Sequence, residues 1–150
     1  MSRDTHQHRP PSPRRTATEV VEIVPATRDT RIVRLRVAEG QSFPFLAGQY
    51  AKVTFPGCPP RDYSMAARPD RGFLEFHIRE VAGGAASAHV ARTLKPGDPV
   101  MLDGPYGSAY LREDRAGPIV AIAAATGLAP VKAIVERALY LGFCQPIHVF

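Results

Sequence analysis

The segment RDYSMA, residues 61–66, places a guanidinium, a phenol ring and a hydroxyl close together in the chain. Side chains alternate between the two faces of an extended strand, so Arg61 and Tyr63 are expected on one face and Asp62 and Ser64 on the other. A planar cation beside an aromatic ring suits a ligand that carries both a phosphate and a flat ring system. An ordinary strand with a half-buried tyrosine and a solvated arginine explains the segment equally well, so both interpretations stay open at this point.

A second candidate site is the glycine-rich stretch GGAAS, residues 83–87. Gly83 and Gly84 would let the main chain approach a ligand closely, and the free N–H groups at the start of a helix favour a phosphate. Ser87 is also a preferred helix cap, and on its own the stretch more readily indicates a capped helix after a turn. Taken together with RDYS, it favours phosphate binding.

A third stretch, ATGLAP (residues 125–130), follows an apolar run and precedes a helical pattern. The start of a helix after a buried strand is where α/β units bind nucleotide phosphates. Thr126 and Gly127 are therefore candidates for contacts with a nicotinamide nucleotide. The full dinucleotide fingerprint G-x-G-x-x-G is absent, so this stretch alone is a weak signal.

Several segments alternate between apolar and polar residues, as strands with one solvated face do. Strands are predicted over residues 18–24, 27–37, 47–55, 61–66, 72–80 and 99–107, with a helix over residues 82–94. Antiparallel strands with one intervening helix indicate a small Greek-key β barrel.

The pattern changes after residue 115. An apolar run at residues 119–130, a helix over residues 129–142 and a strand at residues 145–150 predict one β-α-β unit, the beginning of an α/β nucleotide-binding fold. One face of this helix is expected to carry Val131, Ile134, Val135, Ala138 and Leu139, and the other Lys132, Glu136 and Arg137. Such a unit leaves apolar faces uncovered, so we expect a truncated domain or one completed by another chain.

The net charge of +5 is concentrated near the N-terminus, because residues 1–17 hold four arginines and one aspartate, which is +3. This segment is rich in Pro, Arg, Ser and Thr and is predicted to be a disordered tail. The rest of the chain has no basic stripe interleaved with aromatic residues, which argues against binding to nucleic acid.

No apolar run is long enough to span a membrane, and the N-terminal residues lack the apolar core of a signal peptide. We therefore expect a cytoplasmic protein without a membrane partner. Cys58 and Cys144 are the only cysteines. Two thiols cannot supply the four thiolates of an iron–sulfur cluster or a structural zinc site, and no metal site is expected.

Four segments, RDYSMAARPD, LEFHIRE, GPYGSAYLRED and GLAPVKAIVERAL, occur in one order. Together they resemble the ferredoxin–NADP reductase superfamily, whose FAD-binding domain is of the FR type. The likeness is greatest to the reductase components of bacterial aromatic-ring dioxygenases of the naphthalene type and covers residues 18–150. It implies an FAD-binding barrel domain over residues 18–115 and an incomplete NAD(P)-binding α/β unit over residues 116–150.

The resemblance also implies roles for the candidate residues. Arg61 would bind the FAD pyrophosphate, Tyr63 would lie against the isoalloxazine ring, and Ser64 would place its hydroxyl near flavin N5, although no residue is assigned as catalytic with certainty. The remaining implied cofactor contacts are His77 and Ile78 near the ribityl and adenosine part of FAD, Gly83, Gly84 and Ser87 at its phosphates, and Thr126 and Gly127 at NADH or NADPH.

In the complete enzyme, electrons would pass from NAD(P)H through FAD to a ferredoxin or oxygenase partner. This chain differs from the family pattern at Ala124 and Ala125, where GGTG or GGSG is usual, and it lacks the later nucleotide-binding elements. The alternative hypothesis is therefore a truncated, non-catalytic remnant that binds flavin or a partner chain without reducing anything.

Overall fold

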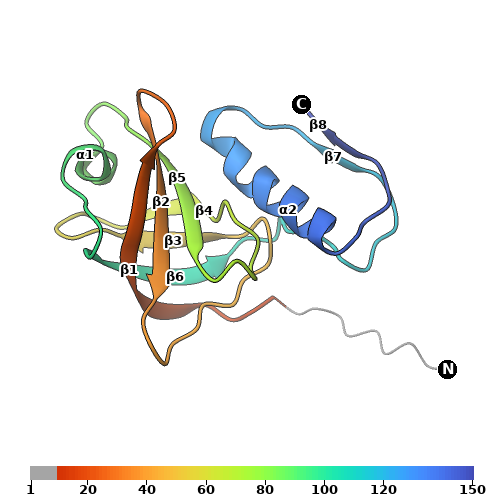
Figure 1. The fold of residues 1–150 in the computed structure, drawn as a ribbon, viewed down its shortest axis with the longest axis horizontal. Coiled ribbons are helices and arrows are strands. Elements are labelled where there is room, and N and C mark those ends of the chain that lie inside the picture. Colours follow the sequence, from red (N-terminus) through yellow and green to blue (C-terminus); the bar gives the residue numbers. More distant parts are fainter. Residues whose placement is uncertain (1–9) are drawn as a thin grey trace.

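The computed structural model describes residues 10–150, and its main body is a six-stranded antiparallel barrel (Figure 1). The strands run in the order β4-β3-β6-β1-β2-β5 around the barrel. Their bounds are β1 Arg14–Pro25, β2 Thr30–Val37, β3 Tyr50–Thr54, β4 Arg61–Ser64, β5 Leu74–Arg79 and β6 Pro99–Tyr106. The predicted antiparallel barrel with one helix is confirmed.

One junction between neighbouring strands of the barrel lacks a continuous ladder of hydrogen bonds. Five pairs of neighbouring strands form antiparallel ladders. The remaining pair, β4 and β5, is joined within the described residues by one isolated bridge between Met65 and Phe76. We call this junction the β4–β5 seam.

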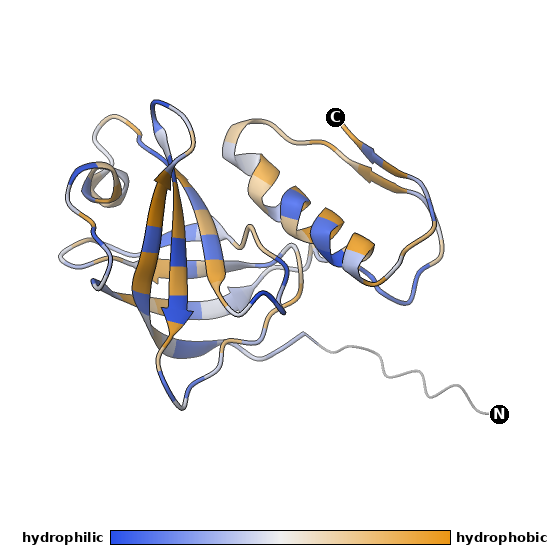
Figure 2. Cartoon of the chain, viewed as in Figure 1, coloured by the Kyte–Doolittle hydropathy of each residue, from blue (hydrophilic) through white to orange (hydrophobic). Residues whose placement is uncertain are grey.

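The apolar residues of the alternating segments form the core of the barrel. Hydrophobic and hydrophilic residues alternate along the strands (Figure 2). On β2, for example, Val33 and Leu35 are fully buried while Arg34 between them points outward. Removing these side chains from water is the main favourable term in folding the barrel.

The one helix of the barrel, α1 (Ala85–Arg92), packs Ala86 and Val90 into the same core. It begins three residues later than predicted, because Gly83 adopts a φ of +75° and Gly84 is the N-cap. The preceding residues 82–84 thus form a turn that aims the start of α1.

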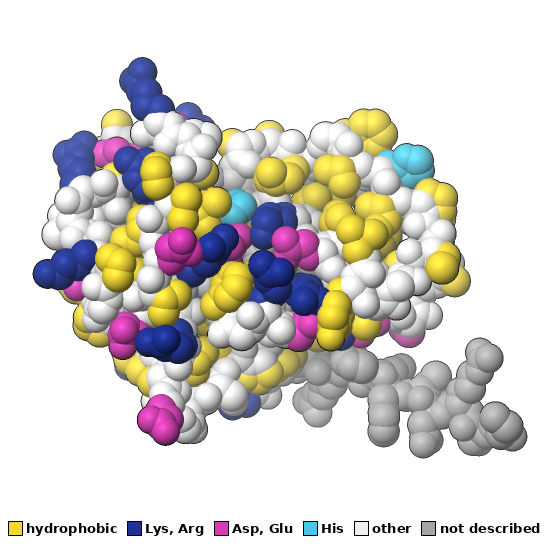
Figure 3. Space-filling view, in the orientation of Figure 1, with side chains coloured by type: hydrophobic (Ala, Val, Ile, Leu, Met, Phe, Trp, Pro, Cys, Tyr) yellow, Lys and Arg dark blue, Asp and Glu magenta, His cyan; other side chains and the backbone are white. Residues whose placement is uncertain are grey.

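The second unit contains β7 (Ile119–Ala121), a short 3-10 helix η1 (Ala125–Gly127), α2 (Leu128–Tyr140) and β8 (Ile147–Val149). β7 and β8 pair in parallel, as the β-α-β prediction requires. Large apolar side chains of this unit are exposed, including Ile122 at 80% and Phe150 at 74%. Hydrophobic side chains accordingly gather on its surface (Figure 3).

The predicted apolar face of α2 is only partly buried. Ala138 is fully buried as expected, but Leu139, assigned to the same face, is 63% exposed. Ala129 and Ala133 are buried although they were not assigned to it. The charged side chains Lys132 and Arg137 reach toward the barrel and bind carboxylates there. Leu139 is thus the member of the predicted apolar face that stays exposed, while ion pairs and apolar contacts both hold the helix against the barrel.

The disordered tail predicted over residues 1–17 is also too long. Residues 14–17 form the start of β1 and pair with β6, and Thr16 is only 1% exposed. The part of the prediction that falls on residues 1–9 lies outside the described residues.

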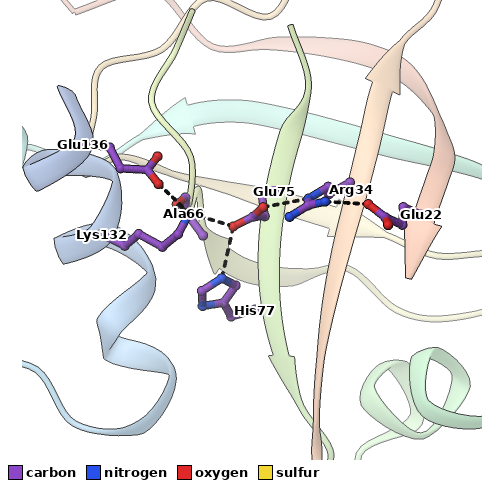
Figure 4. Close-up of polar contacts among 7 residues, drawn as sticks. All are labelled: Glu22, Arg34, Ala66, Glu75, His77, Lys132 and Glu136. Carbon is purple, nitrogen blue, oxygen red and sulfur yellow. Dashed lines mark hydrogen bonds and ion pairs between the residues drawn. The ribbon is translucent and has the colours of Figure 1, made fainter. Parts of the chain in front are cut away.

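A buried carboxylate, Glu75 on β5, joins the barrel to α2 (Figure 4). Glu75 is only 2% exposed. One oxygen accepts a hydrogen bond from Arg34 Nε on β2 at 2.8 Å. The other accepts one from Lys132 Nζ on α2 at 2.9 Å and lies 3.2 Å from His77 Nε2. Charged side chains gather between the two units on the face shown in Figure 3.

The ionised form of Glu75 is strongly favoured in the folded protein. Burial opposes ionisation, but hydrogen bonds from His77, Arg34 and Lys132 outweigh it and lower the pKa of Glu75 from 4.5 to about 2. A carboxylate with a depressed pKa in the folded state stabilises that state above its unfolded pKa, and this stabilisation is lost as the pH falls through the folded pKa. A depression of this size corresponds to about 3 kcal/mol.

Glu75→Gln tests this contribution. At neutral pH the variant should be less stable than the wild type by about 3 kcal/mol, and the difference should shrink as the pH falls from about 5 to about 2. Urea unfolding followed by circular dichroism at a series of pH values measures this. Glu39→Gln, at an exposed carboxylate, is the matched control and should follow the wild type. A constant difference between Glu75→Gln and the wild type across this range would contradict the account.

Candidate functional site

Strand β4 holds an exposed cation beside a half-buried aromatic ring. Tyr63 packs against the barrel core, and its ring meets Phe55 edge-on with centroids 6.4 Å apart. Arg61 is exposed, and its Nη1 donates to the Pro60 carbonyl at 3.0 Å. Burial raises the pKa of the Tyr63 phenol, and the Arg61 cation opposes that rise. Tyr63 therefore stays protonated at neutral pH, with a guanidinium two residues away along the same side of the strand.

The main chain of β4 is available to a ligand along one side. β4 pairs with β3 through residues Arg61–Ser64, opposite Tyr50–Val53. On its other side, within residues 10–150, no ladder covers Arg61–Ser64, since the seam holds only the Met65–Phe76 bridge. Unpaired N–H and C=O groups at a strand edge are ready to bind a polar partner.

The turn before α1 forms the second part of the site. The hydroxyl of Ser87 accepts a hydrogen bond from the Val81 N–H at 3.2 Å and donates one to the Gly84 carbonyl at 3.1 Å. Ser87 is buried, so the structure places its hydroxyl in the turn and makes Gly84, not Ser87, the N-cap. The first N–H groups of a helix have no partners within the helix and attract anions.

An open pocket of about 510 Å³ lies at this helix start. Gly83, Gly84 and Ala85 line it, and the charged residues of its lining are two arginines and two carboxylates, Arg28, Arg92, Asp29 and Glu80. Gly84 is tightly enclosed from the other side, because a Cβ there would lie 2.6 Å from Ser87 Oγ and 2.6 Å from Val81 Cγ2. The glycine thus permits a compact turn whose main chain faces the pocket.

Residues at the end of β3 and in the loop after it contact both β4 and α1, with Phe55 near His89 in the last turn of the helix and Cys58 near Ala85 at its start. The Phe55 ring lies 6.4 Å from Tyr63 and 6.5 Å from His89 of α1, measured between ring centroids. Close by, Cys58 Sγ is 3.9 Å from the Ala85 carbonyl oxygen. The two stretches singled out in the sequence, RDYS and GGAAS, therefore belong to one region of the surface.

A separate groove of about 540 Å³ brings two further predicted residues together. His77 and Arg79 of β5 line one side, and Ala125 and Thr126 of η1 line the other. Gly127, by contrast, is the N-cap of α2 with an ordinary φ of −61°, and a Cβ at that position would meet no atom within 4 Å.

Two details change the sequence-based picture of these residues. Ile78 is 1% exposed and points into the barrel core, so only its main chain is open to a ligand.

Ala125 has a φ of +51°, in the left-handed region that favours glycine. The usual family glycine would be unstrained there, so the departure from GGTG is accommodated at a cost in backbone energy.

The sequence analysis missed how the end of β4 is held. The Ala66 carbonyl accepts a hydrogen bond from Lys132 Nζ at 2.9 Å, and the Ala66 N–H donates to the Glu75 carbonyl at 2.7 Å. Arg34 and Glu75 face each other on the neighbouring strands β2 and β5, and this pairing is seen only once the strands are aligned. The hydrogen bond from Lys132 of α2 to Ala66 joins residues that are far apart in the sequence, so no local sequence pattern predicts it.

Residues 17–110 match the family model of the oxidoreductase FAD-binding domain. The chain is 43% identical over 131 residues to the naphthalene 1,2-dioxygenase system ferredoxin–NAD(P)(+) reductase component of Pseudomonas putida. It is 38% identical over 141 residues to the alkene monooxygenase system ferredoxin–NAD(+) reductase component of Xanthobacter autotrophicus. These matches cover 87% and 93% of this chain but only 39% and 42% of the two relatives.

Solved structures agree. The Amycolatopsis cytochrome P450 reductase GcoB superposes with a TM-score of 0.81 at 37% identity, over 91% of this chain and 42% of its own. A ferredoxin reductase in carbazole 1,9a-dioxygenase gives 0.82 at 31% identity, over 92% and 42%. The predicted resemblance to oxygenase reductase components is confirmed, and, with a family model matched over more than half of its length, the chain belongs to the oxidoreductase FAD-binding domain family.

Proposed function

We propose that this chain binds FAD at the β4–β5 seam and forms the flavin-binding part of an electron-transfer reductase. The observation that carries the proposal is an exposed Arg61 two residues from a half-buried Tyr63 on an edge strand, with Cys58 of the preceding loop 3.9 Å from the Ala85 carbonyl oxygen at the start of α1. A dinucleotide with a diphosphate and a flat ring fits this combination of a fork-shaped cation, an aromatic ring and free helix N–H groups.

The residues present suit FAD. Arg61 would bind the diphosphate together with the N–H groups that follow Gly83 and Gly84, while Tyr63 would lie against the isoalloxazine ring. Ser64, also on the open strand, would offer its hydroxyl near flavin N5. Ser87 would act through the turn that it holds rather than by direct contact. When bound, FAD accepts a hydride and releases single electrons, which is chemistry that the side chains themselves do not supply.

The groove between β5 and η1 is the candidate place for the nicotinamide nucleotide. His77 and Thr126 both line it, and His77 follows Phe76, the β5 residue of the seam bridge. Gly127 would contribute through the start of α2, and Ile78 through its main chain toward FAD. NADH and NADPH carry the same reacting ring, so either is compatible with the groove.

The partner follows from the relatives, which are named as ferredoxin reductase components of oxygenase systems. In a complete reductase, electrons would leave the flavin for a ferredoxin or an oxygenase component. The chain spans about 40% of these relatives' length, so this assignment concerns the longer protein.

We place the domain boundary between residues 115 and 116. No helix among residues 10–150 is long and apolar enough to cross a membrane. Two free cysteines suit the proposed cytoplasmic location.

A second candidate function is a non-catalytic remnant that holds flavin or a partner without reducing it. A remnant would leave the apolar side chains of the α/β unit exposed, whereas the longer protein would cover them.

Arg61→Met tests the proposed diphosphate contact. Loss of the charge-assisted hydrogen bonds should weaken FAD binding about 10- to 100-fold, with a smaller effect for Arg61→Lys, which keeps the charge but not the planar fork. Titration calorimetry with FAD measures this. Arg36→Met removes another exposed arginine, on β2, and should bind as the wild type does. Equal affinities of Arg61→Met and the wild type would exclude the contact.

Gly84→Ala tests the turn before α1. The added Cβ would overlap Ser87 and Val81, so the turn must shift at a cost of about 1–3 kcal/mol in unfolding free energy, and FAD binding should weaken as well. Gly117→Ala is the matched control, since a Cβ there meets no atom within 4 Å. Denaturant unfolding and FAD titration of both variants provide the measurement. A Gly84→Ala protein with unchanged FAD affinity would mean that this turn takes no part in binding.

Anaerobic mixing of the FAD-loaded protein with NADH, and separately with NADPH, distinguishes the two candidate functions. A reductase should lose its visible flavin absorbance with at least one of them. A remnant should keep oxidised flavin with both nucleotides, yet lose the absorbance with dithionite, which needs no nucleotide site and serves as the control.

A further inference from the structure

We propose that Lys132 of α2 is a positioning residue for the flavin strand, because it holds the exit of β4 and thereby links the α/β unit to the cofactor site. This inference rests on the proposed FAD site along β4. It adds a residue that lies outside that site and acts on it through the main chain.

The ammonium group of Lys132 uses all three of its donors. Its Nζ lies 2.9 Å from Glu75 Oε1, 2.9 Å from the Ala66 carbonyl oxygen and 3.0 Å from Glu136 Oε1 (Figure 4). An ammonium carries three N–H donors, so no further partner is needed. One side chain thus joins β5, the end of β4 and its own helix.

Ala66 is the point where this arrangement reaches the flavin strand. It follows Ser64 by two residues and is fully buried. Its N–H donates to the Glu75 carbonyl, while its carbonyl accepts from Lys132. Met65, between Ser64 and Ala66, forms the one bridge of the seam. The exit of β4 is therefore fixed by β5 on one side and by Lys132 on the other.

Removing Lys132 would leave a buried acceptor without its partner. The Ala66 carbonyl would lose the Lys132 hydrogen bond in a place with little access to water, and leaving such a group unsatisfied is costly. Glu75 would still be held by Arg34 and His77, so β5 would keep its main anchors. The disturbance is therefore directed at the end of β4.

A second group of contacts supplies the matched control. Arg137, one turn further along α2, binds Glu113 at 2.8 Å and Asp70 at 3.4 Å. These contacts also dock α2 on the barrel side, but none of them involves Ala66 or Glu75. Weakening the docking of α2 alone can thus be separated from releasing β4.

The experiment compares Lys132→Met, Lys132→Arg and Arg137→Met with the wild type. Amide hydrogen exchange of the flavin-free proteins should show faster exchange around residues 64–66 in Lys132→Met, whereas Arg137→Met should accelerate exchange only within α2. FAD titration should give roughly tenfold weaker binding for Lys132→Met, with a shifted visible flavin spectrum, and unchanged binding for Arg137→Met. Lys132→Arg, which keeps a cation, should restore part of the affinity.

Similar exchange patterns and FAD affinities for Lys132→Met and Arg137→Met would overturn the inference, since Lys132 would then only dock the helix. So would a Lys132→Met protein with wild-type exchange at residues 64–66. A wild type that binds no FAD would refute the proposed function, while the exchange data on the flavin-free proteins would still decide whether Lys132 holds β4.

Discussion

The β4–β5 seam is the constraint on which this structure depends. A barrel that completed its ladder here would pair the main chain of Arg61–Ser64 with β5 and leave little for a ligand. With one bridge, at Met65 and Phe76, the described strands keep the barrel closed while the edge of β4 stays open. Exposed strand edges need cover, and a bound cofactor that accepts hydrogen bonds from the edge would provide it. The opening in the barrel and the proposed site are thus one feature.

Ion pairs and apolar contacts together hold the α/β unit on the barrel, since Ala133 and Ala138 of α2 share a buried cluster with Ala47 and Leu111. Glu75 is buried in the wall of the barrel, and hydrogen bonds from cations on β2 and α2 favour its ionised form. Arg34 and His77 hold the carboxylate independently of the helix, while the Glu75–Lys132 pair constrains how α2 lies against the barrel. The same pair contacts the end of β4, so the orientation of α2 and the shape of the seam are connected.

Local patterns were enough to predict the barrel. Alternation identified the inward residues of β2, whereas the cofactor contacts of Arg61 and Tyr63 stay a prediction from their spacing on β4. Long-range pairing could not be predicted in this way. The extension of β1 to Arg14 depends on pairing with β6, and the contact between Lys132 and Ala66 depends on how α2 docks. Neither leaves a periodic signal in its own segment.

The most direct test of the central claim is a crystal structure of the protein with bound FAD. Our account predicts the diphosphate between the Arg61 guanidinium and the first turn of α1, and the isoalloxazine ring against Tyr63 along the open edge of β4. FAD bound elsewhere on the molecule, or bound with Arg61 turned away from the diphosphate, would contradict it.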